Sequence, residues 1–451
     1  MFIDFLLDTF RRYADQDAII WHDTAYTYQW LFERTRHWRD VIRVNQIIKG
    51  TVAILEADFS PNSIALFIAL IEAGCVSVPF TPNVPRDELI EIAEGEVCFS
   101  SDEDDDISIK PLNRSATHKL YLQLRSREHP GLVSFSSGST GGSKAAVHDM
   151  TCLLDKYKTP RHRLRAISFL LFDHLGGINT MLYTLSNGGC LVVVPDRSPD
   201  SVLRAVERHQ VQLLPTTPTF INLILISEAY KRYKLNSLEV VTYGTEPMPE
   251  STLSAFHHLF PAIRLVQTYG LSEVGVLRSK SKGSDSLWVK IGGEGFVTRV
   301  VDGVLHIKAH SAMLGYLNAP NPYTEDGWFN TRDHVEVDGE YMRIIGHESA
   351  VINVGGEKVY PAEVESIIQE LDNVAEAAVY GEKNAILGNI VCARVTLIES
   401  EPLKLFTTRL KQFCRQRLPR YKMPMKIIVS SKFHHSARLK KIRKTDTTSS
   451  K

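Results

Sequence analysis

The chain has 451 residues, with 52 Lys and Arg against 52 Asp and Glu, and therefore no formal net charge. Hydrophobic residues make up 43% and charged residues 23%, a balance that excludes disordered, collagen-like and fibrous proteins. Proteins that mainly bind nucleic acid usually carry a basic surplus, so the even charge argues against that class. The length predicts two or three domains with a large buried core.

The six cysteines lie far apart with no C-x-x-C pair, which predicts buried, reduced thiols and not a disulfide framework or a zinc site. The N-terminal stretch has acids inside its apolar run and no basic start, so it is a poor signal peptide. The longest apolar stretch, residues 63–80, contains Glu72 and Gly74 and ends in a strand-like run, which argues against a membrane span. We therefore expect a cytoplasmic protein with no membrane-spanning segment.

The first half of the chain alternates short apolar runs with segments of helical spacing. Residues 63–74 have helical spacing and end at a glycine cap signal. Residues 198–209 form another helical segment, which Ser198 or Asp200 could cap. The strand-like runs are residues 51–57, 76–80, 190–195, 211–215, 238–244 and 263–270. This repetition of strand, helix and strand predicts α/β layers around a largely parallel sheet.

The later part of the chain changes character. Residues 294–345 alternate apolar and polar side chains around Asp-Gly turns, which predicts antiparallel hairpins. From Ala350 onward the pattern predicts a separate unit with two helices and two strands, and it holds 18 Lys and Arg against 10 Asp and Glu. The remaining residues hold 34 basic and 42 acidic side chains. This contrast predicts an anion-binding cleft between the two units, mutual attraction between them, or only solvated faces.

The stretch SFSSGSTGGSKAAVHD, residues 134–149, follows a short apolar run. Its glycines, hydroxyl side chains and single Lys suit a phosphate chain, because backbone N–H groups and hydroxyls can be placed freely around an anion. It is not a Walker A motif, since Ala145 follows Lys144. A plain flexible loop is the alternative interpretation.

Four later segments carry further candidates. In QTYGLSEVG, Tyr269 can stack on a planar ring, and Glu273 follows a strand, where acidic metal ligands often lie in α/β proteins. In GWFNTRD, Asp333 can accept hydrogen bonds from ribose hydroxyls, or it is only a turn residue. The glycine pair 355–356 permits close backbone approach to a ligand, and the basic tail 436–444 supplies cations.

Taken together and in this order, these segments resemble the adenylate-forming superfamily of acyl-CoA synthetases, peptide-synthetase adenylation domains and firefly luciferases. The resemblance covers nearly the whole chain, and INVGGEKVYPAEVE is especially similar to the acyl-CoA synthetase branch. It implies an α/β fold with a large N-terminal domain, residues 1–346, of layered α/β sheets plus a β-barrel-like part. A small mobile α+β domain, residues 350–451, follows a hinge at 346–350 that pivots at Ser349.

The resemblance implies two half-reactions. A carboxylate attacks the α-phosphate of ATP to give an acyl-adenylate and pyrophosphate, and a thiol then displaces AMP. The implied cofactors are ATP and Mg²⁺, and we expect the acceptor to be CoA or the phosphopantetheine of a separate carrier protein. The alternatives are a stand-alone adenylation enzyme that loads such a carrier, and a catalytically degenerate relative that binds nucleotide or acyl groups. No nucleic-acid partner is expected.

The resemblance assigns site residues by their match to the family motifs. The phosphate loop comprises Ser136, Ser137, Gly138, Ser139, Thr140, Gly141 and Lys144. The adenine and ribose residues are Gly244, Thr245, Glu246, Tyr269, Gly270, Asp333 and His347. Glu273 and Thr140 are the expected Mg²⁺ ligands and catalytic groups, with Ser272 beside Glu273. Gly355 and Gly356 match the loop that faces the thiol tunnel after the small domain rotates.

The catalytic Lys of the mobile domain matches Lys440, because Arg443 then keeps the family's spacing, although Lys441 is the alternative. The usual Gly before this Lys is Leu439 here. Three further positions depart from the family pattern. They are Ser143 in place of Pro, Arg332 in place of Gly and His347 in place of Arg. Histidine is shorter and mostly neutral at pH 7, so the grip on the nucleotide is expected to be weaker.

The segment FDHLGGIN, residues 172–179, resembles the part of the family that lines the acyl pocket. His174 matches the gating side chain, whereas Asp173 could pair with a substrate amine or act only as a turn or cap residue. The other residues expected in the pocket are Gly177, Thr216, Phe220, Tyr243 and Thr268. Side-chain identities alone do not give the volume of the pocket or the identity of the acid.

Overall fold

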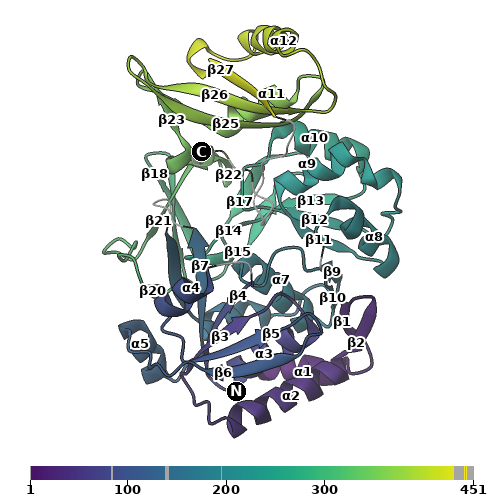
Figure 1. Ribbon diagram of the computed structural model, residues 1–451, viewed down its shortest axis with the longest axis vertical. Helices are drawn as coiled ribbons and strands as arrows, with labels where there is room; N and C mark the ends of the chain where they lie inside the picture. Colours follow the sequence, from purple (N-terminus) through teal and green to yellow (C-terminus); the bar gives the residue numbers. More distant parts are fainter. Residues whose placement is uncertain are drawn as a thin grey trace, which may run out of the picture.

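The computed structural model describes residues 2–82, 85–137, 142–194, 196–430, 441 and 443. Within these residues, two seven-stranded sheets, a six-stranded sheet and a two-stranded ribbon build a large N-terminal domain, and a five-stranded sheet builds a small C-terminal domain. Figure 1 shows the C-terminal domain at one end of the molecule, above the sheets of the N-terminal domain. The α/β fold with a smaller C-terminal domain is as predicted.

One seven-stranded sheet has the order β13-β12-β11-β9-β10-β1-β2, and all of its pairs are parallel except β1 with β2. Its strands are β1 (Asp17–Trp21), β2 (Thr24–Thr27), β9 (Arg165–Ile167), β10 (Cys190–Val192), β11 (Leu213–Thr216), β12 (Val240–Tyr243) and β13 (Arg264–Gln267). The predicted parallel sheet is thus confirmed. Helix α8 (Pro199–His209) begins as predicted at Ser198, whose side chain accepts a hydrogen bond from the Ser201 N–H.

The other seven-stranded sheet has the order β20-β8-β7-β4-β3-β5-β6 and mixes parallel with antiparallel pairs. Its strands are β3 (Val52–Glu56), β4 (Val76–Phe80), β5 (Val97–Ser101), β6 (Ile107–Pro111), β7 (Gly131–Ser137), β8 (Ser143–Asp149) and β20 (Gly315–Tyr316). Strands β7 and β8 form a hairpin in which Ser136 lies opposite Lys144. The residues on both sides of the glycine-rich stretch therefore pair with each other as the two arms of a hairpin.

Helix α3 (Pro61–Glu72) lies in the core cluster that joins the two seven-stranded sheets. Every residue from Pro61 to Ile71 is buried, as expected for a helix that is apolar on all sides. The helix begins with a capping box at Ser60 and Ser63, and Gly74 follows its end with φ +76°. The other helices of the N-terminal domain are α1 (Asp4–Arg12), α2 (Tyr28–Val44), α4 (Arg86–Ile92), α5 (Lys119–Arg127), α6 (Met150–Leu154), α7 (Leu175–Ser186), α9 (Pro218–Ser227) and α10 (Glu250–Leu259).

The six-stranded sheet is antiparallel, with the order β16-β17-β22-β21-β19-β18. Its strands are β16 (Ser279–Ser281), β17 (Trp288–Ile291), β18 (Phe296–Val301), β19 (Val304–Ala309), β21 (Phe329–Asp338) and β22 (Tyr341–His347). The predicted hairpins are confirmed as β18–β19 and β21–β22. The register of β21–β22 places Asp333 directly opposite His347. The ribbon β14 (Tyr269–Leu271) and β15 (Gly275–Leu277) follows β13.

The C-terminal domain has the sheet order β24-β23-β26-β25, with β27 parallel to β26. Its elements are β23 (Ile352–Val354), β24 (Glu357–Val359), α11 (Pro361–Gln369), β25 (Val374–Asn384), β26 (Gly388–Leu397), α12 (Leu403–Arg415) and β27 (Lys426–Ser430). The two predicted helices and the two predicted strands are all present. The domain has its own apolar core, which includes Val364 of α11, Val379 of β25 and Phe406 of α12.

Glu365 of α11 binds Lys441 and Arg443 to the C-terminal domain. Its carboxylate is buried and accepts two hydrogen bonds from Arg443, at 2.7 and 2.8 Å, and one from the Lys441 ammonium at 3.3 Å. The Val379 N–H also donates to it, at 2.9 Å. Burial by itself would raise the pKa of Glu365, but the charges of Arg443 and Lys441 overcome this and lower it to about 2.

The six cysteines carry free thiols, and all except Cys152 are buried, as predicted. Of the helices in the described part of the chain, none combines the length and the apolar character needed to traverse a bilayer.

Arg332 has φ +58° in strand β21, a left-handed conformation that favours glycine. This backbone conformation explains why the family pattern has a glycine at the position of Arg332. We predict that Arg332→Gly stabilises the N-terminal domain by about 1 kcal/mol. The control is Glu336→Gly in the same strand, where the side chain is exposed and φ is not positive. This control is expected to destabilise, and equal effects of both variants on the unfolding midpoint would contradict the explanation.

Glu365→Gln removes the only negative charge that pairs with both described tail residues, Lys441 and Arg443. We predict a loss of roughly 3 kcal/mol from the C-terminal domain, measured by hydrogen exchange of α11 and β25 amides. The folded pKa of Glu365 is depressed, so its contribution is present above about pH 4.5 and is lost as the pH falls towards 2. The control is Glu370→Gln, which breaks a half-exposed pair between Glu370, just after the end of α11, and Arg417, and it should cost under about 1 kcal/mol.

Candidate active site between the domains

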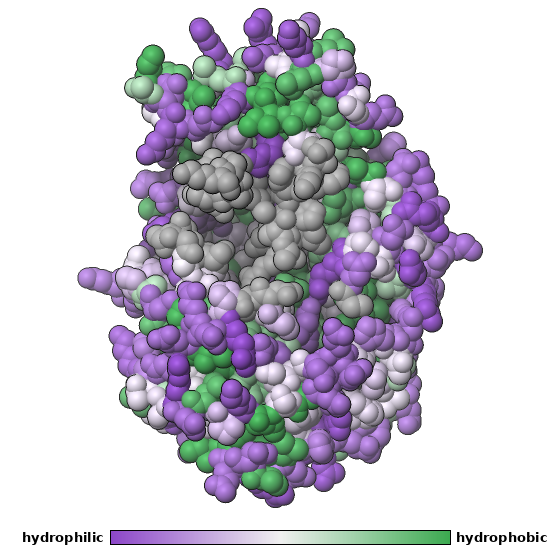
Figure 2. All heavy atoms as spheres, in the orientation of Figure 1, coloured by the Kyte–Doolittle hydropathy of each residue, from purple (hydrophilic) through white to green (hydrophobic). Residues whose placement is uncertain are grey.

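A cavity of about 1590 Å³ lies between the two domains, at the carboxyl ends of the parallel strands β11, β12 and β13. Ligands of open α/β sheets bind at this edge. The C-terminal domain contributes charged side chains to the wall, such as Arg394 and Lys426, and apolar ones, such as Ile352 and Ile428. On the face shown in Figure 2, apolar residues gather on the C-terminal domain next to the space between the domains. The cavity is therefore built from both domains.

Asp333 lies in the cavity wall and is almost fully buried. It accepts a hydrogen bond of 2.5 Å from the Tyr269 hydroxyl, and its own N–H donates to Thr331 Oγ1 at 3.0 Å. Burial raises the pKa of the Asp333 carboxyl, while the Tyr269 hydroxyl and the nearby His347 oppose that shift. The arrangement leaves a pre-oriented acceptor beside an aromatic ring, as binding of a ribose and a base would need.

His347 lies opposite Asp333 and also lines the cavity. Its Nδ1 accepts a hydrogen bond from the Ser349 N–H at 3.2 Å and lies 2.7 Å from the Ser349 hydroxyl. His347 therefore caps the short 3₁₀ turn Glu348–Ala350 that leads into the C-terminal domain. The expected hinge residue, Ser349, and the residue expected at the ribose are thus bonded to each other.

Glu273 lies in the turn between β14 and β15, and its side chain lines the cavity. It accepts a hydrogen bond of 2.5 Å from the Tyr316 hydroxyl, and the Lys144 ammonium lies 5.4 Å from the centre of the Tyr316 ring. Tyr316 thereby connects the expected phosphate-binding Lys with the expected metal-binding acid. No local sequence pattern signals this role of Tyr316.

The backbone around Glu273 is fixed by three separate contacts. His148, buried in β8, donates from Nε2 to the Ser272 carbonyl oxygen at 2.7 Å. The Glu273 carbonyl oxygen accepts from the Met313 N–H at 2.8 Å and from the Tyr323 hydroxyl at 3.2 Å. Burial lowers the pKa of His148 to about 4, so this histidine is neutral and acts as a fixed donor.

The ends of β12 and β13 approach each other closely at Gly244 and Thr268, both in the cavity wall. A Cβ on Gly244 would lie 2.7 Å from both the Thr268 carbonyl oxygen and its hydroxyl, so only glycine fits there. Thr245 follows with φ +72°. Gly270 and Ser272 also line the cavity.

Two buried polar atoms of this wall, Thr216 Oγ1 and Gln267 Oε1, have no hydrogen-bond partner among the described residues, as expected for a wall that completes its bonds with a ligand.

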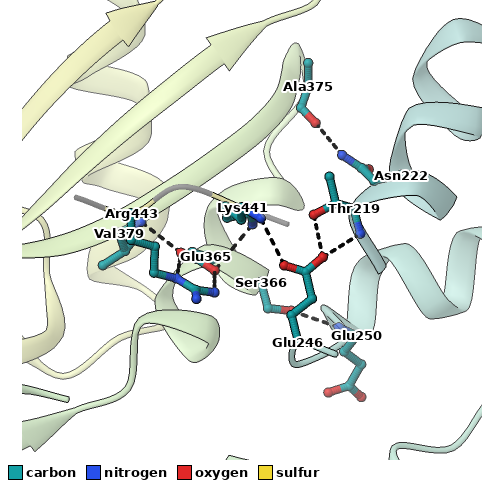
Figure 3. Close-up of polar contacts among 10 residues, drawn as sticks. All are labelled: Thr219, Asn222, Glu246, Glu250, Glu365, Ser366, Ala375, Val379, Lys441 and Arg443. Carbon is teal, nitrogen blue, oxygen red and sulfur yellow. Dashed lines mark hydrogen bonds and ion pairs between the residues drawn. The ribbon is translucent and has the colours of Figure 1, made fainter. Parts of the chain in front are cut away.

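Glu246 joins the two domains instead of leaving its carboxylate open. One oxygen accepts from the Thr219 N–H at 2.9 Å and from the Thr219 hydroxyl, at the start of α9. The other accepts from the Lys441 N–H at 3.1 Å. Figure 3 shows this carboxylate between α9 and the tail, next to Glu365.

Two further contacts cross the same interface: Asn222 donates to the Ala375 carbonyl oxygen at 3.0 Å, and the Glu250 N–H donates to the Ser366 hydroxyl at 3.2 Å.

Helix α7 supplies another wall of the cavity. His174 caps the helix by accepting from the Gly176 N–H at 3.0 Å, and it lines the cavity together with Thr216 and Thr268, two other residues expected in the acyl pocket. Four other residues expected there do not line the cavity and lie in the packed interior. They are Asp173, Gly177, Phe220 and Tyr243. The cap position belongs to His174 and not to Asp173.

The reason for Gly177 is close packing. A Cβ there would lie 2.2 Å from the Leu171 carbonyl oxygen, so the glycine lets α7 approach the backbone before it.

Several predicted residues lie outside the described residues or away from the cavity. Gly138, Ser139, Thr140, Gly141 and Lys440 fall in the ranges that are not described, as does Leu439. Ser136 lines the cavity, but Lys144 does not, and Ser137 is described only as the last residue of β7. Gly355 and Gly356 form the turn between β23 and β24, with φ +57° and +93°, and do not line the cavity.

The comparisons with known proteins cover both domains. Residues 6–317 match the AMP-binding enzyme family, and residues 363–440 match the AMP-binding enzyme C-terminal domain. The chain is 28% identical over 345 residues to the indoleacetate–CoA ligase of Aromatoleum aromaticum, covering 70% of this chain and 66% of that protein. It is 26% identical over 320 residues to the long-chain-fatty-acid–CoA ligase FadD13 of Mycobacterium tuberculosis, covering 66% and 63%. The matches thus span slightly less than two thirds of these relatives.

Solved structures show the same fold at low identity. An anthranilate CoA ligase, AuaEII, in complex with anthranoyl-AMP superimposes with a TM-score of 0.81 at 18% identity, over 97% of this chain and 95% of that one. The o-succinylbenzoate CoA synthetase MenE of Bacillus subtilis gives a TM-score of 0.77 at 18% identity, over 98% and 97%. The family match extends over more than two thirds of the sequence, from the first helix to β20. The chain therefore belongs to the AMP-binding enzyme family.

Proposed function

We propose that this protein activates a carboxylic acid with ATP and transfers the acyl group to the thiol of CoA. One observation carries the proposal: a single cavity collects Asp333 with Tyr269, Glu273, His174 and charged groups of the C-terminal domain. The named activities of the relatives, which are CoA ligases, support it.

Both steps are substitutions in which the atoms balance. A carboxylate oxygen attacks the α-phosphorus and pyrophosphate leaves, and then the thiol sulfur attacks the acyl carbonyl, AMP leaves and the thiol proton goes to solvent. The protein has to hold mutually repelling oxyanions in line and neutralise the charge that develops. A cavity between the domains suits this task, because hydrogen bonds and charges act more strongly in a partly buried site than in bulk water.

In this proposal Tyr269 and the backbone at Gly244–Glu246 bind the adenine, and Asp333 accepts the ribose hydroxyls. Ser136 and residues 138–141, which match the family's phosphate loop, contact the β- and γ-phosphates in this proposal, and the ammonium of Lys144, 5.4 Å from the centre of the Tyr316 ring, balances phosphate charge. His347 stands at the position of the family's arginine, which is expected at the ribose. Because its Nδ1 accepts a hydrogen bond from the Ser349 N–H, its other ring nitrogen is the one left to contact the nucleotide.

The residues present fit a Mg²⁺ ion that arrives with the nucleotide. Proteins bind this ion through one or two carboxylates together with substrate phosphates, and Glu273 places one carboxylate in the cavity wall. Within the described part of the chain, no cluster of three or more His, Cys, Asp or Glu side chains could hold a metal alone. The second protein ligand in this proposal is Thr140, and the bound ion would neutralise phosphate charge.

The acceptor step requires the C-terminal domain to turn about residues 346–350, with domains at 1–346 and 350–451. The proposal rests on the position of Gly355 and Gly356, which lie at a hairpin tip away from the cavity in the present arrangement. Rotation would bring that tip to the thiol. The interface contacts at Glu246, Asn222 and Glu250 would then have to break.

Acid-dependent exchange of pyrophosphate into ATP tests the first step, with hydroxylamine used to trap the acyl-adenylate. We predict exchange with at least one acid from a panel of short, long, aromatic and amino acids. Glu273→Gln should lower the rate at least about 100-fold, because it removes a charge that acts on the phosphates. The control is Glu325→Gln at an exposed turn. A purified, folded protein with no exchange for any acid would support the degenerate alternative and overturn the proposal.

We predict that Lys440 is the catalytic lysine. The Lys441 ammonium is held by buried Glu365, and Arg443 keeps its place on the same carboxylate, which agrees with the spacing that favours Lys440. Lys440→Ala should lower pyrophosphate exchange about 100- to 1000-fold and leave thioester formation from supplied acyl-adenylate nearly intact. Lys441→Ala should lower exchange less than tenfold. The reverse order of the two variants would show that Lys441 is the reactive group.

A further inference from the structure

The part of α7 that faces the cavity carries a polar group with an unusually fixed orientation. Gly176, Asn179 and Thr180 are spaced so that they share one face of the helix, and all three line the cavity. Thr180 donates its hydroxyl back to the Gly176 carbonyl oxygen at 3.0 Å, so this hydroxyl serves the helix. Asn179 has no such bond within the helix and is held from outside it.

Two donors outside α7 hold the Asn179 side-chain carbonyl. The Lys156 ammonium donates to Asn179 Oδ1 at 2.6 Å, and the Tyr157 hydroxyl donates to the same atom at 2.9 Å. A primary amide has one acceptor oxygen and one donor NH₂ group. With the oxygen taken by these two donors, the NH₂ group is the end of Asn179 that remains for the cavity side.

Lys156 is itself anchored on a second residue of the cavity wall. Its ammonium donates to the Val276 carbonyl oxygen of β15 at 3.0 Å, and Val276 lines the cavity. Burial of the ammonium end, reinforced by the charge of Arg278, lowers the pKa of Lys156 to about 7. The lysine thus ties α7 to β15 behind the wall, at a cost in desolvation that a plain apolar contact would not carry.

Apolar side chains share this wall with Asn179. Leu170, Leu175 and Leu271 line the same cavity, and Leu170 packs close to Gly176. In such a pocket a single, well-oriented polar group determines which ligands fit, because a ligand that lacks the matching group leaves it unpaired.

We propose that Asn179 is a specificity-determining residue and that the preferred acid carries a hydrogen-bond-accepting oxygen, such as a hydroxyl or keto group, in its tail. This inference rests on the proposed acid activation, and it names the substrate class of that site. Lys156 and Tyr157 are positioning residues that act through Asn179.

Matched pairs of acids test this proposal, each pair differing by one tail oxygen: hexanoate with 5-oxohexanoate, benzoate with 4-hydroxybenzoate, and 3-phenylpropanoate with 3-(4-hydroxyphenyl)propanoate. We expect the oxygen-bearing acid of at least one pair to have a kcat/KM at least tenfold higher in pyrophosphate exchange. Asn179→Leu should bring that ratio close to one or reverse it. Lys156→Met should lower the ratio mainly through KM. Thr180→Val, on the same helix face, is the matched control and should leave the ratio unchanged.

Equilibrium binding of the same acids, measured by titration calorimetry, separates this inference from the proposed function. A protein that binds the oxygenated acids more tightly, and loses this preference in Asn179→Leu, supports the inference even if exchange is absent. Equal or tighter binding of the hydrocarbon acids by the wild-type protein would overturn it. An equal loss of binding for both members of each pair in Asn179→Leu would assign the residue a merely structural role and would also overturn it.

Discussion

The hydrogen bond between the Tyr269 hydroxyl and Asp333 is the contact on which the arrangement of the cavity depends. It is buried and joins the ribbon that follows the parallel sheet to the hairpin of the antiparallel sheet. Because Asp333 of β21 pairs directly with His347 of β22, fixing Asp333 also fixes His347 and the turn that leads to the C-terminal domain. The ribbon that carries Tyr269, the hairpin that carries Asp333 and the turn towards the smaller domain are therefore coupled through one buried pair.

Two carboxylates with different surroundings hold the C-terminal domain and the tail. Glu365 is buried inside that domain and carries two cationic partners, so its charge is compensated locally. Glu246 belongs to the large domain and offers one oxygen to each side of the interface. In the proposed rotation of the C-terminal domain, the contacts of Glu365 can persist, because both partners belong to that domain, whereas the contact of Glu246 with Lys441 has to break.

The wall formed by α7 differs from the nucleotide side in its chemistry. The side proposed for the nucleotide presents carboxylates and backbone groups at strand ends, whereas α7 presents the oriented amide of Asn179 beside Thr180 and apolar side chains. Polar groups are expensive to bury without partners, and the lysine behind the amide adds to that cost. A helix that only had to pack would not need Lys156, Tyr157 and Asn179 joined in this way.

The sequence by itself determined the order of the elements, the α/β class and the motifs, because hydrophobic period and glycine-rich spacing are local signals. It placed Ser136, Tyr269, Glu273 and Asp333 as site residues, and the structure brings all four to one cavity. It could not show that Tyr316 bridges Lys144 and Glu273, that Glu246 contacts Lys441, or that Lys156 orients Asn179, since these partners are far apart in the chain. It also placed Phe220 and Tyr243 in the pocket, whereas they pack in the core. Strand ends and helix faces meet only after the sheets twist and the domains close, so tertiary structure alone decided which side chains face the ligand.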